Sequence, residues 1–276
     1  MIKIFLTVRN RLAITQKCIR ALKLHSKIPH QIYVYNNNTN HLLDQHFAYF
    51  YKLFENNVIS QVTFTKNEAT FNAFSKASTC NFWGNQHEMD PKKSTYDYLV
   101  MLDNDIIVTP EWDVKLKLAW KHVNKNNLTN IKVIGQRPGG IKGITQKIKI
   151  TKEIVGKVGK LGGSGLWSVR PNFFTDVGFL NLKQLVGHDK RHDQLYWSLM
   201  ERAASGQPYI MGLNQKLGIH CGKEAGSVCN KLTRNRNNKN KEETIKFADA
   251  EKKIASMDFD DFFNQICNNR NLTNDW

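Results

Sequence analysis

Apolar and polar positions alternate in blocks along the first half of the chain, and each block has the period of one kind of element. Residues 2–8 and 31–35 are short runs rich in β-branched and aromatic side chains, which predicts strands. Between them, over residues 12–25, apolar positions recur at helical spacing. Further segments follow in the same order: a helix at 41–56, a strand at 58–65, a helix at 67–78 and a strand at 98–102. This alternation predicts an α/β fold, with a mostly parallel central sheet covered by helices on both faces.

The second half begins with a helix at 112–124 and a strand at 131–135, after which the composition changes. Residues 136–165 are rich in glycine, and between residues 141 and 160 six lysines accompany the single Glu153. Alternation from Lys147 to Thr151 predicts a hairpin with one polar face. We expect this segment to be a basic excursion from the sheet, either a flap, an acceptor-binding surface or only a solvated face.

The remaining residues return to the fold and then leave it. A glycine-rich strand is expected at 161–171, a helix at 194–204 and a strand at 208–213, with His220 in a glycine-flanked turn. Residues 223–241 are rich in Lys, Arg and Asn, with their most basic part at 231–241, and amphipathic helices are expected at 242–257 and 259–267. We therefore expect one domain over residues 1–222, and a basic arm and C-terminal helices over 223–276 that pack on it.

The strand at 98–102 ends in Asp103-Asn104-Asp105. In open α/β sheets, ligands bind beside the carboxyl ends of the strands. Two carboxylates there can face one divalent cation, and oxygen ligands suit Mg²⁺ or Mn²⁺, which would hold a diphosphate. The alternative is a turn in which both aspartates cap backbone amides.

Polar residues follow the first two strands as well, and we expect them at the same edge of the sheet. Arg9 and Arg11 carry guanidinium forks that suit phosphate, while Thr7, Asn36 and Asn37 offer neutral hydrogen-bonding groups. Together with Asp103 to Asp105, these loops predict a nucleotide-sized cleft. The asparagine-rich turn from Asn36 to Asn40 also has a purely conformational explanation.

Asp189 and Asp193 are four residues apart and precede a predicted helix. On a helix they share one face, and near its N-terminus both tend to stay ionised, as a general base requires. Helix capping is the alternative for both residues. His220 is a candidate metal ligand or a hydrogen-bonded structural group.

The formal net charge of +16 attracts anions, including nucleic acid, acidic polymers and nucleotide phosphates. No apolar window of about eighteen residues predicts a membrane span. The five cysteines are odd in number and have no paired metal-ligand spacing, and the apolar N-terminal run is too short for a signal peptide. We therefore expect a cytoplasmic protein.

Taken in order, these elements resemble the family 2 glycosyltransferases, which have the GT-A (Rossmann-like) fold, over roughly residues 2–222. The resemblance is carried by the following segments: Thr7 to Arg11, Asn36 to Thr39, Asn67-x4-Asn72, Asp103-Asn104-Asp105, Gly162-Gly163 running to Arg170, Val177-Gly178-Phe179, the acidic motif at Asp189, and His220.

The resemblance implies a metal-dependent, inverting transfer of a hexosyl or pentosyl group from a nucleoside diphosphate sugar, with a UDP-sugar foremost. Carried over by position, Asp103, Asp105 and His220 would hold Mn²⁺ or Mg²⁺, and Asp189 would be the base that deprotonates the acceptor. The residues implied for nucleotide-sugar binding are Thr7, Arg9, Arg11, Asn36, Asn37, Asn67, Asn72, Asp103, Asn104 and Gly163.

Two departures from the family pattern affect this assignment. The turn after the second strand has asparagines where the family has an aspartate that contacts the base, which leaves the nucleotide open. His188 stands where an acid often precedes the catalytic base, so Asp193 is an alternative to Asp189. The basic segments suggest a polyanionic acceptor, with modified DNA or another nucleic acid first. The competing functions are a nucleotidyltransferase with the same Asp-x-Asp site and a non-catalytic nucleic-acid-binding protein.

Overall fold

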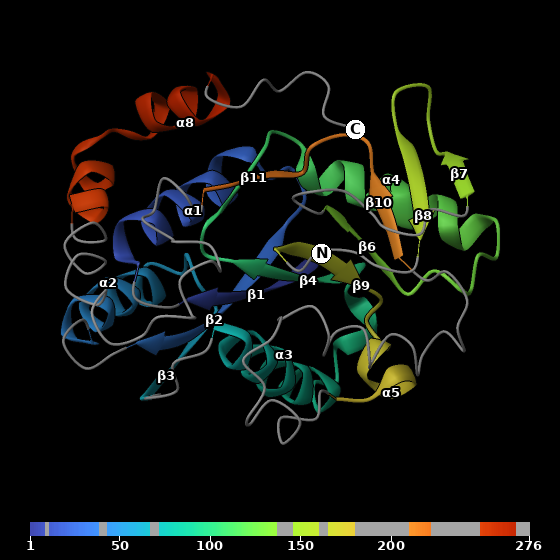
Figure 1. Cartoon of the computed structure of the whole chain (residues 1–276). Coiled ribbons are helices and arrows are strands. Elements are labelled where there is room, and N and C mark those ends of the chain that lie inside the picture. Colours follow the sequence, from blue (N-terminus) through green and yellow to red (C-terminus); the bar gives the residue numbers. More distant parts are fainter. Residues whose placement is uncertain are drawn as a thin grey trace, which may run out of the picture.

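The computed structural model describes residues 1–8, 11–38, 43–66, 72–136, 146–159, 165–179, 210–221 and 249–268. Its described strands form a nine-stranded sheet in the order β3-β2-β1-β4-β9-β6-β10-β8-β7 and a two-stranded sheet of β11 and β5 (Figure 1). The strands are β1 (Ile2–Val8), β2 (His30–Asn38), β3 (Gln61–Lys66), β4 (Tyr98–Asp103), β5 (Ile106–Val108), β6 (Val133–Gln136), β7 (Gln146–Lys149), β8 (Val155–Gly159), β9 (Leu166–Val169), β10 (Ile210–Leu213) and β11 (Gly218–His220). The helices are α1 (Leu12–His25), α2 (Leu43–Glu55), α3 (Asn72–Glu88), the 3₁₀ turn η2 (Lys93–Thr95), α4 (Trp112–Lys125), α5 (Phe173–Val177) and α8 (Phe259–Asn268).

The prediction of a mostly parallel sheet is confirmed. Strands β3, β2, β1 and β4 pair in parallel, and so do β6 and β10. Only β9, between β4 and β6, and β8, between β10 and β7, pair antiparallel to their neighbours. Seven of the nine described strands of this sheet therefore run in one direction.

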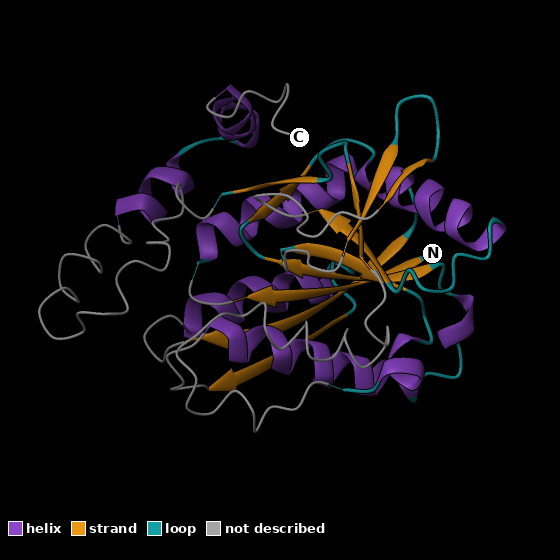
Figure 2. Cartoon of the chain, turned by 45° about the vertical axis from the view of Figure 1, so that its right-hand side comes forward, coloured by secondary structure: helices purple, strands orange, loops and turns teal. Residues whose placement is uncertain are grey.

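Helices cover both faces of the sheet, as the alternation of elements predicted (Figure 2). Along β1, Ile4 and Leu6 belong to the core cluster that includes α1 and α4, whereas Phe5 belongs to the cluster that includes α3 and α5. All three side chains are fully buried. Burial on both faces explains why the central strands are continuous apolar runs rather than alternating ones.

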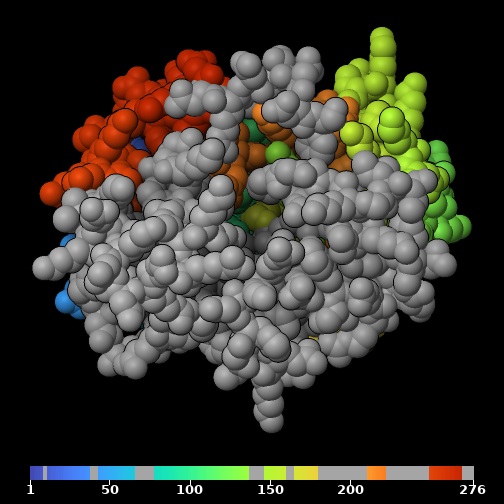
Figure 3. Space-filling view, viewed as in Figure 1, coloured from blue at the N-terminus to red at the C-terminus, as the bar shows by residue number. Residues whose placement is uncertain are grey.

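The C-terminal segment packs against α1. Residues 249–256 are helical, and Ile254 from this stretch joins Phe262 and Ile266 of α8 in the larger core cluster. The rings of His25 and Phe263 lie 4.8 Å apart, centroid to centroid. In Figure 3 these helices, in red, and the β7–β8 hairpin, in yellow-green, lie at opposite upper corners of the molecule. None of the described helices combines the length and the apolar composition that crossing a membrane requires.

Two predicted boundaries are wrong. We expected the second strand to end before Asn36, but β2 continues to Asn38. Asparagine has a low propensity for strands, but here β3 pairs with β2 from Tyr33 through Asn38 and holds these residues in the strand. We expected the third helix to span residues 67–78, but α3 runs from Asn72 to Glu88. A Cβ atom at Gly84 would lie 2.7 Å from Cζ of Phe174, so this glycine serves close packing on α5 rather than helix termination.

The basic hairpin is also placed differently from our expectation. The hairpin forms, and its alternation is confirmed, with Ile148 buried between the exposed Lys147 and Lys149. However, it is not an excursion from the sheet, because β8 pairs with β10 and the hairpin supplies the last two strands. The polar edge strand β7 carries the lysines, a common way for an edge strand to avoid further pairing.

Candidate functional site

The carboxyl ends of β1, β2 and β4 meet at one edge of the sheet, as expected. In the ladder, Thr7 is the partner of both Asp103 and Tyr35, and the next residue of β1 is the partner of Asn36. The turn after β4 is tied to β1 by a hydrogen bond from the Asn104 N–H to the Thr7 carbonyl, with N and O 3.1 Å apart. Three segments that are far apart in sequence thereby converge on the Asp103–Asp105 turn.

The Asp105 carboxylate is the centre of the described part of this site. Asp105 is only 7% exposed, and its Oδ2 accepts a hydrogen bond at 2.7 Å from Nη1 of Arg11. The Nε2 atom of His220 lies 3.5 Å from the same oxygen. The other oxygen, Oδ1, is buried and has no hydrogen-bond partner among the described residues. A buried carboxylate oxygen without a hydrogen-bond donor is energetically unfavourable, and a bound cation would satisfy it.

The second short sheet brings His220 to Asp105. After the turn, β5 leaves the main sheet and pairs antiparallel with β11, with Ile106 opposite His220. The carbonyl of Asp105 accepts a 2.7 Å hydrogen bond from the N–H of Cys221. Our expectation of a glycine-flanked turn at His220 is therefore wrong, because the residue ends a strand whose pairing with β5 positions its ring.

The side chain of Asn104 points into the interior of the protein. It is 7% exposed, and its amide donates to Oγ1 of Thr15 at 2.8 Å, while the Thr15 hydroxyl donates to the carbonyl of Arg11. These bonds join the turn to the first turn of α1, which carries Arg11. The side chain of Asn104 thus stabilises the site, and its predicted contact with the donor remains a prediction.

Asp103 lies at the end of β4 and faces β9. Its N–H donates to the carbonyl of Gly165 at 3.0 Å, and its Oδ2 lies 3.9 Å from the position that a Cβ atom would take at residue 165. The same Cβ would be 2.9 Å from Cδ1 of Ile106, so a larger residue here would displace the end of that side chain. Gly165 was missed by the sequence reasoning, although it belongs to the same glycine-rich run as Gly163.

The predicted metal ligands are only partly assembled. The described His, Cys, Asp and Glu residues contain no group of three arranged to hold a metal ion, but Asp105 and His220 form a pair. Mg²⁺ and similar ions are commonly held by one or two carboxylates together with substrate phosphates and water. The pair, with the unpartnered Oδ1 of Asp105, fits that mode of binding better than a closed protein cage.

Asn36 is fully buried, and its Oδ1 lies 3.1 Å from Nδ1 of His46 on α2. Burial lowers the pKa of His46 to about 4, which keeps the ring neutral, so Nδ1–H donates to the amide oxygen. Asn37 is 2% exposed. Both asparagines therefore lie in the interior of β2, and no pattern in the sequence paired Asn36 with His46.

The other predicted site residues are described in part or not at all. Thr7 is half-buried, and Asn72 begins α3. Arg9, Asn67, Gly163 and both candidate bases, Asp189 and Asp193, lie outside the described residues. Their roles remain predictions.

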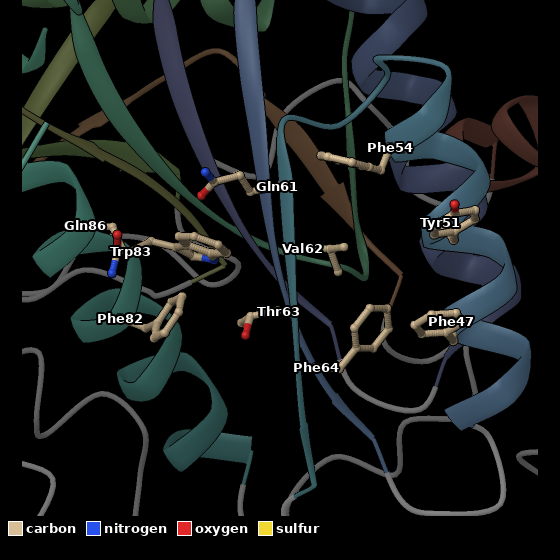
Figure 4. Close-up of a pocket in the computed structure, with 10 residues that line it drawn as sticks. All are labelled: Phe47, Tyr51, Phe54, Gln61, Val62, Thr63, Phe64, Phe82, Trp83 and Gln86. Atoms are coloured by element: carbon tan, nitrogen blue, oxygen red, sulfur yellow. The ribbon is translucent and has the colours of Figure 1, made fainter.

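A hollow of about 500 Å³ lies elsewhere, along the edge strand β3 between α2 and α3 (Figure 4). Val62 and Phe64 point toward the aromatic rings of α2, while Gln61 and Thr63 point toward Phe82 and Trp83 of α3. The ten lining residues include no charged group and none of the predicted site residues. The hollow is thus separate from the Asp105 site and unsuited to a diphosphate.

No family model and no curated protein sequence matches the chain. Several solved structures do. GalNAc-T7 with UDP, GalNAc and Mn²⁺ matches with a TM-score of 0.54 and 10% identity over 77% of this chain and 42% of that one. TarS 1-349 of S. aureus matches with a TM-score of 0.48 and 12% identity over 79% and 59%. A mannosyltransferase from Pyrobaculum calidifontis, in complex with GDP-Man and Mn²⁺, matches with a TM-score of 0.47 and 10% identity over 76% and 56%.

The chain spans about half the length of these structures. At such low identity a likeness concerns the fold, and it is the match to GalNAc-T7 that carries the comparison. Together with the strand order and the Asp103–Asp105 turn beyond β4, it shows that this chain has the GT-A fold.

Proposed function

We propose that this chain is a metal-dependent glycosyltransferase that moves a sugar from a nucleoside diphosphate sugar to a hydroxyl acceptor, with inversion at the anomeric carbon. The observation that carries the proposal is the Asp105 carboxylate, which is buried beyond the end of a central strand and lies beside His220. One of its oxygens has no hydrogen-bond partner in the part of the chain that the structure describes. The same fold in GalNAc-T7, whose structure holds UDP and Mn²⁺, supports it.

In this proposal Asp105, His220 and Asp103 would hold Mn²⁺ or Mg²⁺ when the donor is bound. The cation supplies Lewis-acid stabilisation of the charge that develops on the departing diphosphate. Arg11 is bonded to Asp105 at 2.7 Å, and its planar guanidinium suits phosphate oxygens. The proposal does not fix the nucleotide of the donor. UDP is the first candidate, and other nucleotides are alternatives.

The acceptor hydroxyl forms the new bond to the anomeric carbon while the bond from that carbon to the diphosphate oxygen breaks. The hydroxyl proton passes to a carboxylate, for which Asp189 and Asp193 are the candidates. A positioned base of this kind contributes about 10²- to 10⁴-fold in rate. The acceptor proposed first is a polyanion such as nucleic acid, because Lys147, Lys149 and Lys152 are all exposed on or beside β7. Acceptor binding should then weaken steeply with salt.

The test is a screen of nucleotide sugars by release of the nucleoside diphosphate, with Mn²⁺, Mg²⁺ or chelator, and with or without DNA. Asp105→Asn should lower turnover by about 100-fold or more. Asp97→Asn is the matched control, since Asp97 pairs with the N-terminus and Lys117 on the surface, and it should retain native turnover. Metal-independent turnover would refute the roles of Asp103, Asp105 and His220. Pyrophosphate release from a nucleoside triphosphate would instead identify a nucleotidyltransferase, and no turnover of any donor would favour a binding protein.

A further inference from the structure

Helix α1 has no cap of its own at the end that faces the site. Its N-cap residue is Arg11, whose side chain makes no capping hydrogen bond, and its first turn contains no acidic residue. The first backbone N–H groups of a helix need acceptors from elsewhere, and an acidic group is favoured there by the helix dipole. The acceptor comes from the far end of the chain, because Oε2 of Glu251 accepts a 2.8 Å hydrogen bond from the N–H of Ala13.

The helix end capped in this way also carries Arg11, the residue that holds Asp105. The guanidinium of Arg11 is 2.7 Å from Asp105 Oδ2, and its positive charge also acts on the Glu251 carboxylate. Burial raises the pKa of Glu251, whereas the backbone N–H groups of Ala13 and Ile14 and the Arg11 charge favour its ionised form. Its second oxygen, Oε1, is buried without a hydrogen-bond partner among the described residues. Arg11 is therefore bonded to Asp105, while Glu251 caps the N–H group two residues further along the same helix end.

A divalent cation at Asp105 would compete with Arg11 for the same carboxylate and would repel its guanidinium. We propose that Glu251 is a positioning residue of the donor site: it anchors the first turn of α1 and offers Arg11 a second carboxylate when a cation takes Asp105. The inference rests on the proposed function, and it assigns the C-terminal helices a part in the site that the sequence did not suggest.

The opposite end of α1 provides a matched control. There, Oδ2 of Asp113 accepts hydrogen bonds from the N–H groups of Lys27 and Ile28, at 2.7 and 2.6 Å, just beyond the last residue of the helix. Asp113 and Glu251 are thus both carboxylates that tie backbone amides at an end of α1. Glu251 acts at the end where Arg11 is the N-cap residue, whereas Asp113 acts at the other end.

The experiment measures Mn²⁺ binding to the full chain by calorimetry, with MnCl₂ as the titrant and no donor present. Glu251→Gln and Asp113→Asn each keep an amide oxygen for the backbone N–H groups and remove one charge, so both should fold, which thermal melting checks. We expect Glu251→Gln to weaken Mn²⁺ binding by about fivefold, which corresponds to the loss of one partly screened ion pair. Asp113→Asn should leave Mn²⁺ affinity unchanged. On an Arg11→Gln background, the effect of Glu251→Gln should largely disappear.

Native Mn²⁺ affinity in Glu251→Gln would overturn this inference and leave the proposed function intact. An equal loss on the Arg11→Gln background would also overturn it, because Glu251 would then act on the cation directly. A native chain that binds no Mn²⁺ would overturn the inference and the metal-dependent function together.

Discussion

We predict that the buried pair of Asn36 and His46 makes the stability of this protein sensitive to mild acid. His46 is fully buried, donates from Nδ1 to the Asn36 amide, and has no hydrogen-bond partner for Nε2 among the described residues. Protonation of the ring would place an unpaired charge in the interior, which is why burial lowers the pKa from the ordinary 6.5 to about 4.

The direction in which the free energy of unfolding changes with pH depends on whether the folded or the unfolded chain binds the proton. As the pH falls from 7 to 5, His46 is protonated in the unfolded chain but stays neutral in the folded one, so the free energy of unfolding falls. With pKa values of 6.5 and about 4, the loss from this residue over that interval is roughly 2 kcal/mol, and most of it occurs below pH 6.5. Burial also lowers the pKa of His87, which adds a loss of the same sign.

Urea unfolding at pH 7 and pH 5 tests this, with native protein and His46→Asn compared. The variant leaves a smaller side chain in the core and should be less stable at both pH values. Its loss of stability between pH 7 and pH 5 should nevertheless be smaller than the native loss by about 2 kcal/mol. Equal losses for native protein and His46→Asn, within about 0.5 kcal/mol, would refute the reasoning.

Two further predictions concern the ties that hold α1 in place. Asp113→Ala should lower the free energy of unfolding by about 3 kcal/mol in urea titrations, because it removes the buried acceptor of two backbone N–H groups, and Asp113→Asn should restore most of the loss. Phe262→Ala should lower it by about 3–5 kcal/mol by the same measurement, since this α8 side chain is 2% exposed within the core, whereas the exposed Phe47→Ala should cost far less.

The strand and helix order was predictable from sequence because local periodicity reports burial directly. β1 and β4 are buried on both faces and are continuous apolar runs, and the spacing of Ile14, Cys18 and Leu22 marks the buried face of α1. Where the prediction failed, a distant partner decided the outcome. Asn36 stays in a strand because β3 pairs beside it, and the hairpin at β7 joins the sheet because β10 arrives from more than fifty residues later along the chain.

In the site, too, some features could be predicted from local sequence, and others depend on distant partners. The position of Asp103 and Asp105 after a buried strand was readable, because the carboxyl ends of parallel strands share one edge. The pairing of Asp105 with Arg11, and of the α1 N-terminus with Glu251, joins residues separated by 94 and 238 positions, and no local pattern reports such contacts.

The placement of His220 depends on one such contact closely enough to test. A Cβ atom at Gly218 would lie 2.6 Å from Cγ2 of Ile106 and 3.3 Å from the carbonyl of Ile107, so an added methyl group must push β11 away from β5. Gly218→Ala should therefore move His220 away from Asp105 and weaken Mn²⁺ binding, at a cost of about 1–3 kcal/mol in stability.

Removing the colliding methyl should undo the effect. In Gly218→Ala with Ile106→Ala, the space left by Cγ2 accepts the new Cβ, so calorimetry should show Mn²⁺ affinity close to native even though the loss of Ile106 further destabilises the fold. Affinity that followed total stability, lowest in the double variant, would mean that His220 is not held by this strand pairing. Recovery of affinity against falling stability would instead separate the geometry of the site from the stability of the fold that carries it.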